Sequence, residues 1–503
     1  MSAQRGELFG EETGKADCWI ACPAMAAANS EPSYWPLECD ESQMRTLAEA
    51  ALSRVITHLT SLREAPAWGE EGGQALAETL RTSFAEEGAP LDMLLDTLFD
   101  QALDVTYNTA SGGYFAFIPG GGLFSSAVAD LIADSINRYV AMWIAAPGLV
   151  QMEADVVRWC ADLVGLGPEA GGYLSSGGSM ANLTAVITAR REKLPPHFLE
   201  GVLYTSDQAH HSVKKAALLA GFPQDNLRTI PVDSAFRMRV DALAAQIGND
   251  RAAGLRPFMV VANGGSTNTG AVDPLPAIAD VCHTEDLWLH VDAAYGGFFL
   301  LTERGRKAMR GIEQADSVTM DPHKGLFLPL GTGCLVVRDR LALLRAHAVE
   351  ADYLPEDHRT DEFVNFADLS PELSRDFRGL RVWLPLRLHG VGAFRAALDE
   401  KFQLSDVAHR RLQRMPSVEI VALPQLTITT FRMKVPGASE DELNELNREF
   451  WTLINEGRRF FLSPTIIDGR FVIRLCILHL RTHREIVDYA LDTIERVADK
   501  LSP

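Results

Sequence analysis

The spacing of apolar and polar residues changes along the chain. Between residues 40 and 62 the apolar side chains recur at helical spacing, and a second helix is predicted over 90–103. From about residue 123 to 340, helical stretches alternate with short apolar runs. The helices are predicted over 125–138, 151–166 and 180–193, and the strands read GVLYTS, FMVVAN, LWLHVD, SVTMD and GCLVVRD. Strands separated by helices predict an α/β domain with a mostly parallel sheet flanked by helices.

The order of elements changes after about residue 395. A helix there precedes the apolar runs VEIVALP, LTITTFRM and FVIRLCIL, and a last helix is predicted over 483–500. This order predicts a small α+β domain. We therefore expect three parts: a helical N-terminal segment (1–110, with the first thirty or so residues loosely ordered), a large domain (111–395) and a small C-terminal domain (396–503).

Composition narrows the class of protein. The 503 residues are 47% hydrophobic and 23% charged, which is typical of a globular protein with a large core. The net charge of -20 argues against a nucleic-acid partner. The odd number of cysteines, seven, favours a reducing, cytoplasmic setting, and Cys18 and Cys22 lack the further ligands of a metal site. Apolar runs are shorter than the roughly 18 to 20 residues of a membrane span, so we expect no membrane partner.

Titratable residues gather where predicted strands end. LWLHVD ends in Asp292, GVLYTSDQAH leads to His210, and SVTMDPHK ends in Asp321, His323 and Lys324. Ligands of an open parallel sheet bind beyond the carboxyl ends of its strands. Packing alone does not explain three apolar runs that all end in such residues, and we predict a site there.

A fourth stretch, GGYLSSGGSMANLTAVI, places small residues at 176–179 before a predicted helix. Met180, Leu183, Val186 and Ile187 would share the apolar face of that helix. Small residues at a helix start leave backbone N–H groups free to bind a phosphate, and the helix dipole adds attraction. The alternative is an ordinary N-cap and turn.

Lys324 is either an ordinary surface residue or a residue of the predicted site. A lysine is usually a solvated surface charge, but this one follows an apolar strand and precedes GLFLPLGTG. A partly desolvated lysine loses proton affinity and becomes a usable amine, whose best-known task is a Schiff base with pyridoxal phosphate (PLP). PLP also needs a phosphate cradle and an acid at its pyridine nitrogen. Residues 176–179 and Asp292 supply candidates for both.

These motifs carry a family resemblance. HVDAAYGG, the lysine of DPHK 32 positions later, the upstream SDQAH and the glycine-rich helix start resemble the group II PLP-dependent amino-acid decarboxylases, the family of aromatic L-amino-acid decarboxylase. The resemblance extends from about residue 40 to the C-terminus. It implies the fold-type I architecture, PLP as cofactor, an amino acid as the small-molecule substrate, and a homodimer with active sites at the subunit interface.

The resemblance also implies roles for residues. Lys324 would bind the cofactor aldehyde, Asp292 would hold the pyridinium proton, and His210, favoured over His211 by the DQAH register, would stack on the ring. Tyr353, in EADYLPEDHRT, matches a tyrosine that protonates the substrate Cα after decarboxylation. Relatives that oxidatively deaminate amino acids to aldehydes typically carry phenylalanine there, so this tyrosine favours simple decarboxylation.

Other matched positions lie near the cofactor. Gly178 and Ser179 would bind the phosphate with His323 beside them, whereas Ser266 and Ala294 are expected to lie near the cofactor without a chemical role.

The stretch SGGYFAFIPGGG corresponds to a substrate-pocket segment that usually opens with His-Pro. Gly112 and Gly113 stand there instead, so no role of that histidine can be transferred. Phe115, Phe117 and Trp143 would give the pocket an apolar lining, although each could equally be a core residue. We expect a hydrophobic substrate, aromatic first and branched or sulfur-containing aliphatic second.

Several other functions fit parts of the pattern. Decarboxylation of valine, leucine or methionine is one, and a transaminase, carbon–sulfur lyase or aldehyde synthase of the same fold is another. A non-catalytic dimeric scaffold would be expected to have lost Lys324 or Asp292. A nucleotide-binding loop is disfavoured because no G-x-G-x-x-G follows the first strand.

Overall fold

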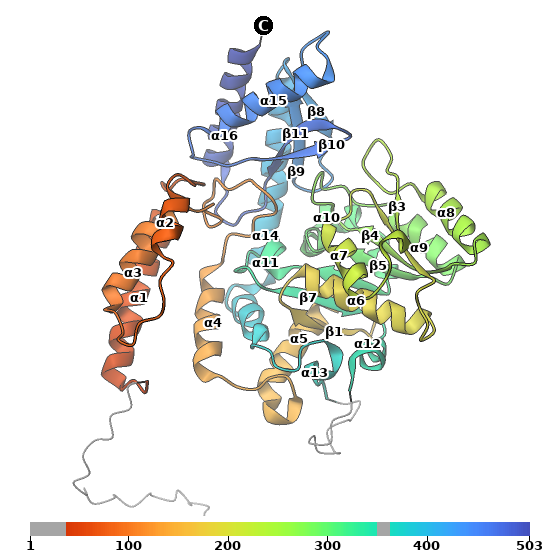
Figure 1. Ribbon diagram of the computed structural model, residues 1–503, viewed down its shortest axis with the longest axis horizontal. Helices are drawn as coiled ribbons and strands as arrows, with labels where there is room; N and C mark the ends of the chain where they lie inside the picture. The colour runs from red at the N-terminus through yellow and green to blue at the C-terminus, as the bar shows by residue number, and fades with distance from the viewer. Residues whose placement is uncertain (1–36, 350–362, 503) are drawn as a thin grey trace, which may run out of the picture. The chain divides into compact units, whose positions relative to one another are not determined.

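The structure is a computed structural model that describes residues 37–349 and 363–502 (Figure 1). The chain separates into two compact units, one ending at Ser53 and one running from Arg54 to the C-terminus. Helix α1 (Glu41–Ser61), which crosses this division, and α3 (Leu91–Asp96), which continues in π and 3₁₀ turns to Val105, agree with the two helices predicted near the N-terminus. A short helix, α2 (Gly73–Thr79), lies between them in sequence.

A seven-stranded sheet forms the centre of the large unit, with the strand order β1-β7-β6-β5-β4-β2-β3. Strands β2 to β6 pair in parallel, and only β7 runs antiparallel to its neighbours β1 and β6, which confirms the mostly parallel sheet. The strands are β1 (Gly171–Ser175), β2 (Gly201–Ser206), β3 (Leu227–Ile230), β4 (Arg256–Asn263), β5 (Trp288–Asp292), β6 (Ser317–Met320) and β7 (Gly333–Val337).

Helices pack around this sheet (Figure 1), which explains why its central strands are continuous apolar runs rather than alternating ones. The helices are α4 (Phe124–Ile136), α5 (Pro147–Val164), α6 (Gly178–Lys193), α7 (His211–Leu219), α8 (Val240–Ala252), α9 (Leu275–Thr284), α10 (Glu303–Ala308), α11 (Pro322–Gly325), α12 (Arg340–His347) and α13 (Phe366–Leu369). Within the described ranges, no helix combines the length and apolar character needed to span a bilayer.

Helix α6 contacts five strands of the sheet, and its buried face differs from the one predicted. Of the four large apolar residues expected to share that face, only Val186 is fully buried. The face against the sheet carries small residues, including Ala181, Asn182 and Ala185, because the helix backbone approaches β4, β5 and β6 closely. A polar residue, Asn182, therefore lies against the carboxyl end of the central strand β5.

The C-terminal part has its own core between a four-stranded antiparallel sheet and three helices, as predicted for a small α+β domain. Its elements are α14 (Arg378–Arg414), β8 (Val418–Ala422), β9 (Ile428–Met433), α15 (Glu440–Asn455), β10 (Ser463–Ile467), β11 (Arg470–Cys476) and α16 (Arg484–Leu501). The proposed boundary between residues 395 and 396 falls inside α14, which kinks at Gly390 (φ +73°).

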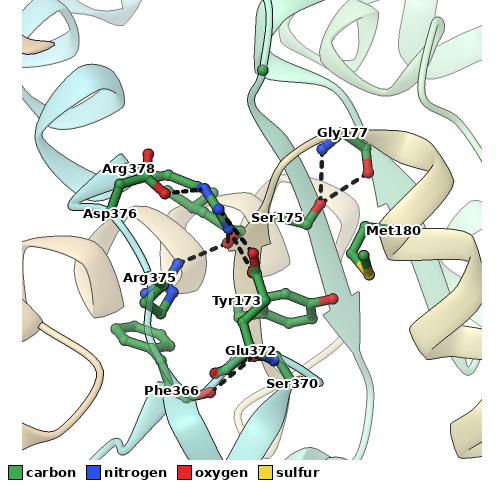
Figure 2. A network of polar contacts seen from close by, with 12 residues as sticks. Tyr173, Ser175, Gly177, Met180, Phe366, Ser370, Glu372, Arg375, Asp376 and Arg378 are labelled. Carbon is green, nitrogen blue, oxygen red and sulfur yellow. Dashed lines mark hydrogen bonds and ion pairs between the residues drawn. The ribbon is translucent and has the colours of Figure 1, made fainter.

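A buried ion pair fixes the end of β1. Arg375 donates to Glu153 Oε1 (2.6 Å), both side chains being 0% exposed, and also to the carbonyl of Leu174 (2.7 Å). Arg378, which pairs with Glu372 (2.6 Å), donates to the same carbonyl (3.2 Å). Figure 2 shows both arginines beside the end of β1, next to the turn at Gly177.

Glu153→Gln is expected to lower the free energy of unfolding by about 3–5 kcal/mol, because Arg375 would stay buried without its counter-charge. Urea unfolding followed by circular dichroism measures this loss. Glu372→Gln is the matched control, since its partner Arg378 keeps Asp376 at 2.8 Å. Equal losses in the two variants would contradict the argument.

Candidate active site

A cavity of about 240 Å³ lies where β4, β5 and β6 end and α6 begins. Parallel strands place their carboxyl ends on one edge of the sheet, so residues far apart in sequence meet there. The cavity brings together every residue that the sequence predicted to bind the cofactor or to lie near it, namely Gly178, Ser179, His210, Ser266, Asp292, Ala294, His323 and Lys324.

The glycine turn before α6 fits a phosphate group. Gly177 has φ +152°, a conformation that other residues rarely adopt, and within the described part of the chain no side chain caps the helix that follows. A Cβ at Gly178 would lie 3.1 Å from Asp321 Oδ2 and 3.2 Å from the Ala294 Cβ, so a larger residue would crowd this turn. The helix start thus offers N–H groups and a positive dipole end to an anion.

Side chains beside the turn are also held in place. The Ser175 hydroxyl donates to the Gly177 carbonyl (3.0 Å) and accepts from the Gly177 N–H (3.3 Å), as Figure 2 shows. His323 Nδ1 donates to the Thr332 carbonyl (2.6 Å), which leaves Nε2 on the side of Asp321 at 3.7 Å. Burial lowers the pKa of His323, so its imidazole is neutral near pH 7.

Lys324 forms an ion pair with Asp321, its Nζ lying 2.9 Å from Oδ2. Both residues belong to the turn of α11, where positions three apart share a face. Burial lowers the pKa of Lys324, but the charge and hydrogen bond of Asp321 and the charge of Asp292 together raise it above the ordinary lysine value. The expectation that desolvation would lower this pKa is therefore wrong for the chain without cofactor, because Asp321 supplies a buried counter-charge.

Asp321→Asn is expected to move the attachment of PLP to Lys324 to lower pH. Because the pKa of Lys324 is raised in the folded protein, its ion pair with Asp321 contributes fully to stability below the pKa of an ordinary lysine. That contribution is lost as the pH rises through the pKa of Lys324 in the folded protein. Without Asp321 the neutral amine, which is the nucleophile, appears at lower pH. The rate of cofactor attachment, followed by visible absorbance between pH 6 and 10, tests this. An unchanged or upward-shifted profile would contradict it.

Asp292 ends β5 and is almost fully buried. Its Oδ2 accepts from Asn182 Nδ2 (2.8 Å), and its Oδ1 accepts from the Ala294 N–H (3.2 Å). Both oxygens of this carboxyl group thus accept hydrogen bonds at the end of β5. A carboxylate in this place suits a protonated ring nitrogen.

His210 is the N-cap residue of α7, and its Nδ1 accepts from the Ser212 N–H (3.3 Å). Burial lowers the pKa of His210, although the charge of Asp292 acts in the opposite sense. The neighbouring His211 is exposed and does not line the cavity, in keeping with the choice of His210 from the motif.

Several residues that line the cavity received no role from the sequence, among them Asn182, Ser212 and Asp321. The signal for Asp321 was present, because it stands three positions before Lys324 in a predicted turn. The signal for Asn182 was an asparagine among the small and apolar residues 178–189 that form most of α6.

The predicted substrate residues do not line this cavity in the single chain. Phe115 is buried in the core of the C-terminal part, and the Phe117 side chain is 56% exposed. The Trp143 ring stacks on Phe363 with 3.8 Å between ring centroids. Tyr353 lies outside the described residues. The roles of these residues stay predictions.

The glycines at 112 and 113 have a structural reason. A Cβ at Gly112 would lie 2.4 Å from the Arg481 carbonyl oxygen, and one at Gly113 would lie 2.3 Å from that of Arg459. Side chains at either position would collide with backbone. The packing of this segment therefore requires glycine at both positions.

Comparison with known proteins adds evidence independent of this geometry. Residues 74–434 match the model of the pyridoxal-dependent decarboxylase conserved domain. The aromatic-L-amino-acid decarboxylase of Bacillus atrophaeus is 36% identical over 469 residues, which cover 93% of this chain and 98% of that protein. Phenylacetaldehyde synthase of Arabidopsis thaliana is 27% identical over 92% of this chain and 97% of its own length.

Among solved structures, the crystal structure of Oryza sativa TDC with PLP and tryptamine superposes with a TM-score of 0.88 at 27% identity, covering 94% of this chain and all of that one. The likeness confirms the fold-type I architecture expected from the motifs. The glycine turn, the half-buried lysine and the buried carboxylate of the cavity fit PLP. With a family model matching most of its length, this chain belongs to the pyridoxal-dependent decarboxylases and is a PLP-dependent amino-acid decarboxylase.

Proposed function

We propose that the enzyme converts a hydrophobic L-amino acid, aromatic rather than aliphatic, to the corresponding amine and carbon dioxide. The observation that carries the proposal is that Lys324 and Asp292 line one cavity together with the glycine turn at Gly178. These three features are the amine, the acid and the anion site that a PLP enzyme needs.

Each of these residues has a distinct task. Lys324 would bind the cofactor aldehyde and exchange protons as an amine, and Asp321 is placed to hold its ammonium form. The N–H groups at Gly178 and Ser179 would hold the phosphate, and His210 would lie against the ring. Asp292 would keep a proton on the ring nitrogen. When bound, PLP supplies an electron sink for the bond that loses carbon dioxide.

Tyr353 completes the reaction in this proposal by donating a proton to the substrate Cα. A tyrosine at this position favours amine over aldehyde as the product, which separates the proposed activity from that of relatives such as phenylacetaldehyde synthase.

Preference for an aromatic side chain is supported by the relative that is 36% identical, which is an aromatic-L-amino-acid decarboxylase. The apolar residues Phe115, Phe117 and Trp143 of the predicted substrate pocket agree with this preference.

We further propose that the enzyme is a cytoplasmic homodimer and that the partner subunit completes the substrate pocket. The dimer is supported by the family resemblance and by Phe115, Phe117 and Trp143, because none of these predicted substrate residues lines the cavity of the single chain. Light scattering of the PLP-loaded enzyme tests it, with a mass near twice the 55.1 kDa chain expected.

A panel of substrates tests the activity. We expect kcat/KM for tryptophan, tyrosine or phenylalanine to exceed that for valine, leucine and methionine by at least about 10-fold, a difference that an apolar pocket can supply. Glutamate should not react measurably. Amine, carbon dioxide and hydrogen peroxide are measured side by side in each reaction. Preference for glutamate would refute the pocket, and aldehyde with peroxide as the main products would refute the role of Tyr353.

A further inference from the structure

A chain of buried hydrogen bonds runs beneath the cavity from Asp292 into the sheet. Asn182 Nδ2 donates to Asp292 Oδ2 (2.8 Å), while Asn182 Oδ1 lies 2.8 Å from Thr319 Oγ1 and 3.0 Å from His290 Nε2. On its other ring nitrogen, His290 Nδ1 lies 2.8 Å from the hydroxyl of Ser317. All these side chains are more than 90% buried.

Asp292 at one end of these hydrogen bonds and Trp288 at the other indicate which groups donate and which accept. Asp292 as a carboxylate can only accept, so the amide nitrogen of Asn182 faces it and the amide oxygen faces the sheet. That oxygen accepts from the Thr319 hydroxyl (2.8 Å), and His290 Nε2, 3.0 Å away, is placed to donate to it as well. At the far end, the Ser317 oxygen lies 2.8 Å from His290 Nδ1 and accepts from Trp288 Nε1 (2.8 Å), which can only donate.

His290 suits a neutral link in this chain. It is fully enclosed between β4 and β6, and burial lowers the pKa of His290 to about 4, even though the charge of Asp292 acts in the opposite sense. One ring nitrogen therefore donates and the other accepts at physiological pH.

The same amide also reaches His210. Asn182 Nδ2 donates to the Ser212 hydroxyl (3.0 Å), whose oxygen lies 2.8 Å from His210 Nδ1. Since the Ser212 N–H also points at Nδ1, that nitrogen is an acceptor and the ring proton of His210 sits on Nε2. One side chain thus connects the two residues that the proposed function places at the ring nitrogen and on the ring face.

We propose that Asn182, oriented by His290, Ser317 and Trp288, is a positioning residue that holds Asp292 as an anion facing the ring nitrogen and fixes the tautomer of His210. Asn182 acts on the cofactor through Asp292 and adds no chemistry of its own. The inference rests on the proposed pairing of Asp292 with the ring nitrogen of PLP.

Binding of two cofactors to the unloaded protein tests this. One is PLP, and the other is its carbocyclic analogue, in which C–H replaces the ring nitrogen and so removes the group that Asp292 binds. Wild type is expected to prefer PLP. Asn182→Leu keeps the volume but removes the donor to Asp292, and should weaken PLP binding roughly 10- to 100-fold, the size of a hydrogen bond to a charged group. Binding of the analogue should change by no more than about 3-fold, since it makes no bond to Asp292.

Thr188→Val is the matched control, because it is also an isosteric loss of a buried polar group on α6 but lies outside this chain of bonds. It should leave the preference for PLP unchanged. Should Asn182→Leu fail to fold, His290→Phe provides a second variant. It removes one of the two donors to Asn182 Oδ1, and the preference should fall roughly 2- to 10-fold.

An unchanged preference in the Asn182 or the His290 variant would overturn the inference, as would an equal loss in Thr188→Val. A failure of the proposed function would give a distinct result, because the wild-type protein itself would then bind PLP and the analogue equally well, or bind neither.

Discussion

Lys324→Ala is expected to abolish the visible absorbance of the lysine-bound cofactor and to lower turnover by roughly 10³-fold or more, because the variant loses the amine that binds the cofactor aldehyde. Among the described residues that line the cavity, Lys324 is the only lysine, so no neighbour can replace it. PLP should still bind weakly and without a covalent bond, since the glycine turn and Asp292 remain. Absorbance after gel filtration and a carbon dioxide release assay measure both effects.

Lys215→Ala serves as the control, because Lys215 is an exposed lysine on α7 that does not line the cavity. It should keep both the absorbance and the turnover. If the Lys324 variant still bound PLP in a borohydride-reducible form, another amine would be the cofactor lysine and the site would have been assigned wrongly.

Asp292→Asn is expected to give the second largest effect, a fall in kcat of about 10²- to 10³-fold with the cofactor still attached to Lys324. The substitution keeps the shape of the side chain and its place at the end of β5 but removes the negative charge. A neutral amide no longer favours the protonated ring nitrogen, so the ring accepts electrons less readily. The visible spectrum and kcat are measured on the same preparation.

Asp207→Asn is a suitable comparison, since Asp207 directly follows β2 at the same edge of the sheet but is exposed and does not line the cavity. Its kcat should stay within about 3-fold of the wild type, the usual range for a surface substitution. A kcat for Asp292→Asn close to that of the wild type would show that the ring nitrogen does not depend on this carboxylate.

The central strands could be predicted from the sequence because burial on both faces turns them into continuous apolar runs. Strand β1 (GGYLS) was missed since it holds few large apolar residues, and β3 (LRTI) since it is a half-exposed edge strand. Helix α15 was missed although its capping box at Ser439 and Glu442 is a recognisable signal.

The cofactor residues could be predicted because parallel strands bring their carboxyl ends together whatever the details of packing. Their electrostatics could not. The raised pKa of Lys324 depends on the single turn of α11 that places Asp321 beside it. The role of Asn182 depends on which face of α6 lies against β5, and the pattern of large apolar residues pointed to a different face.

The predicted substrate-pocket residues are the part of the site that the structure of one chain does not explain. Phe115 packs in a core and Trp143 stacks on Phe363, so neither lines the cavity of one chain. In the proposed dimer, the partner subunit would complete the pocket.

Borohydride reduction of the PLP-loaded enzyme, followed by proteolysis and mass spectrometry of the peptides, tests the central claim most directly. The account predicts one phosphopyridoxyl group per chain, on the peptide that contains DPHK and at Lys324. A label on any other lysine, or no label on a preparation that still decarboxylates amino acids, would contradict it.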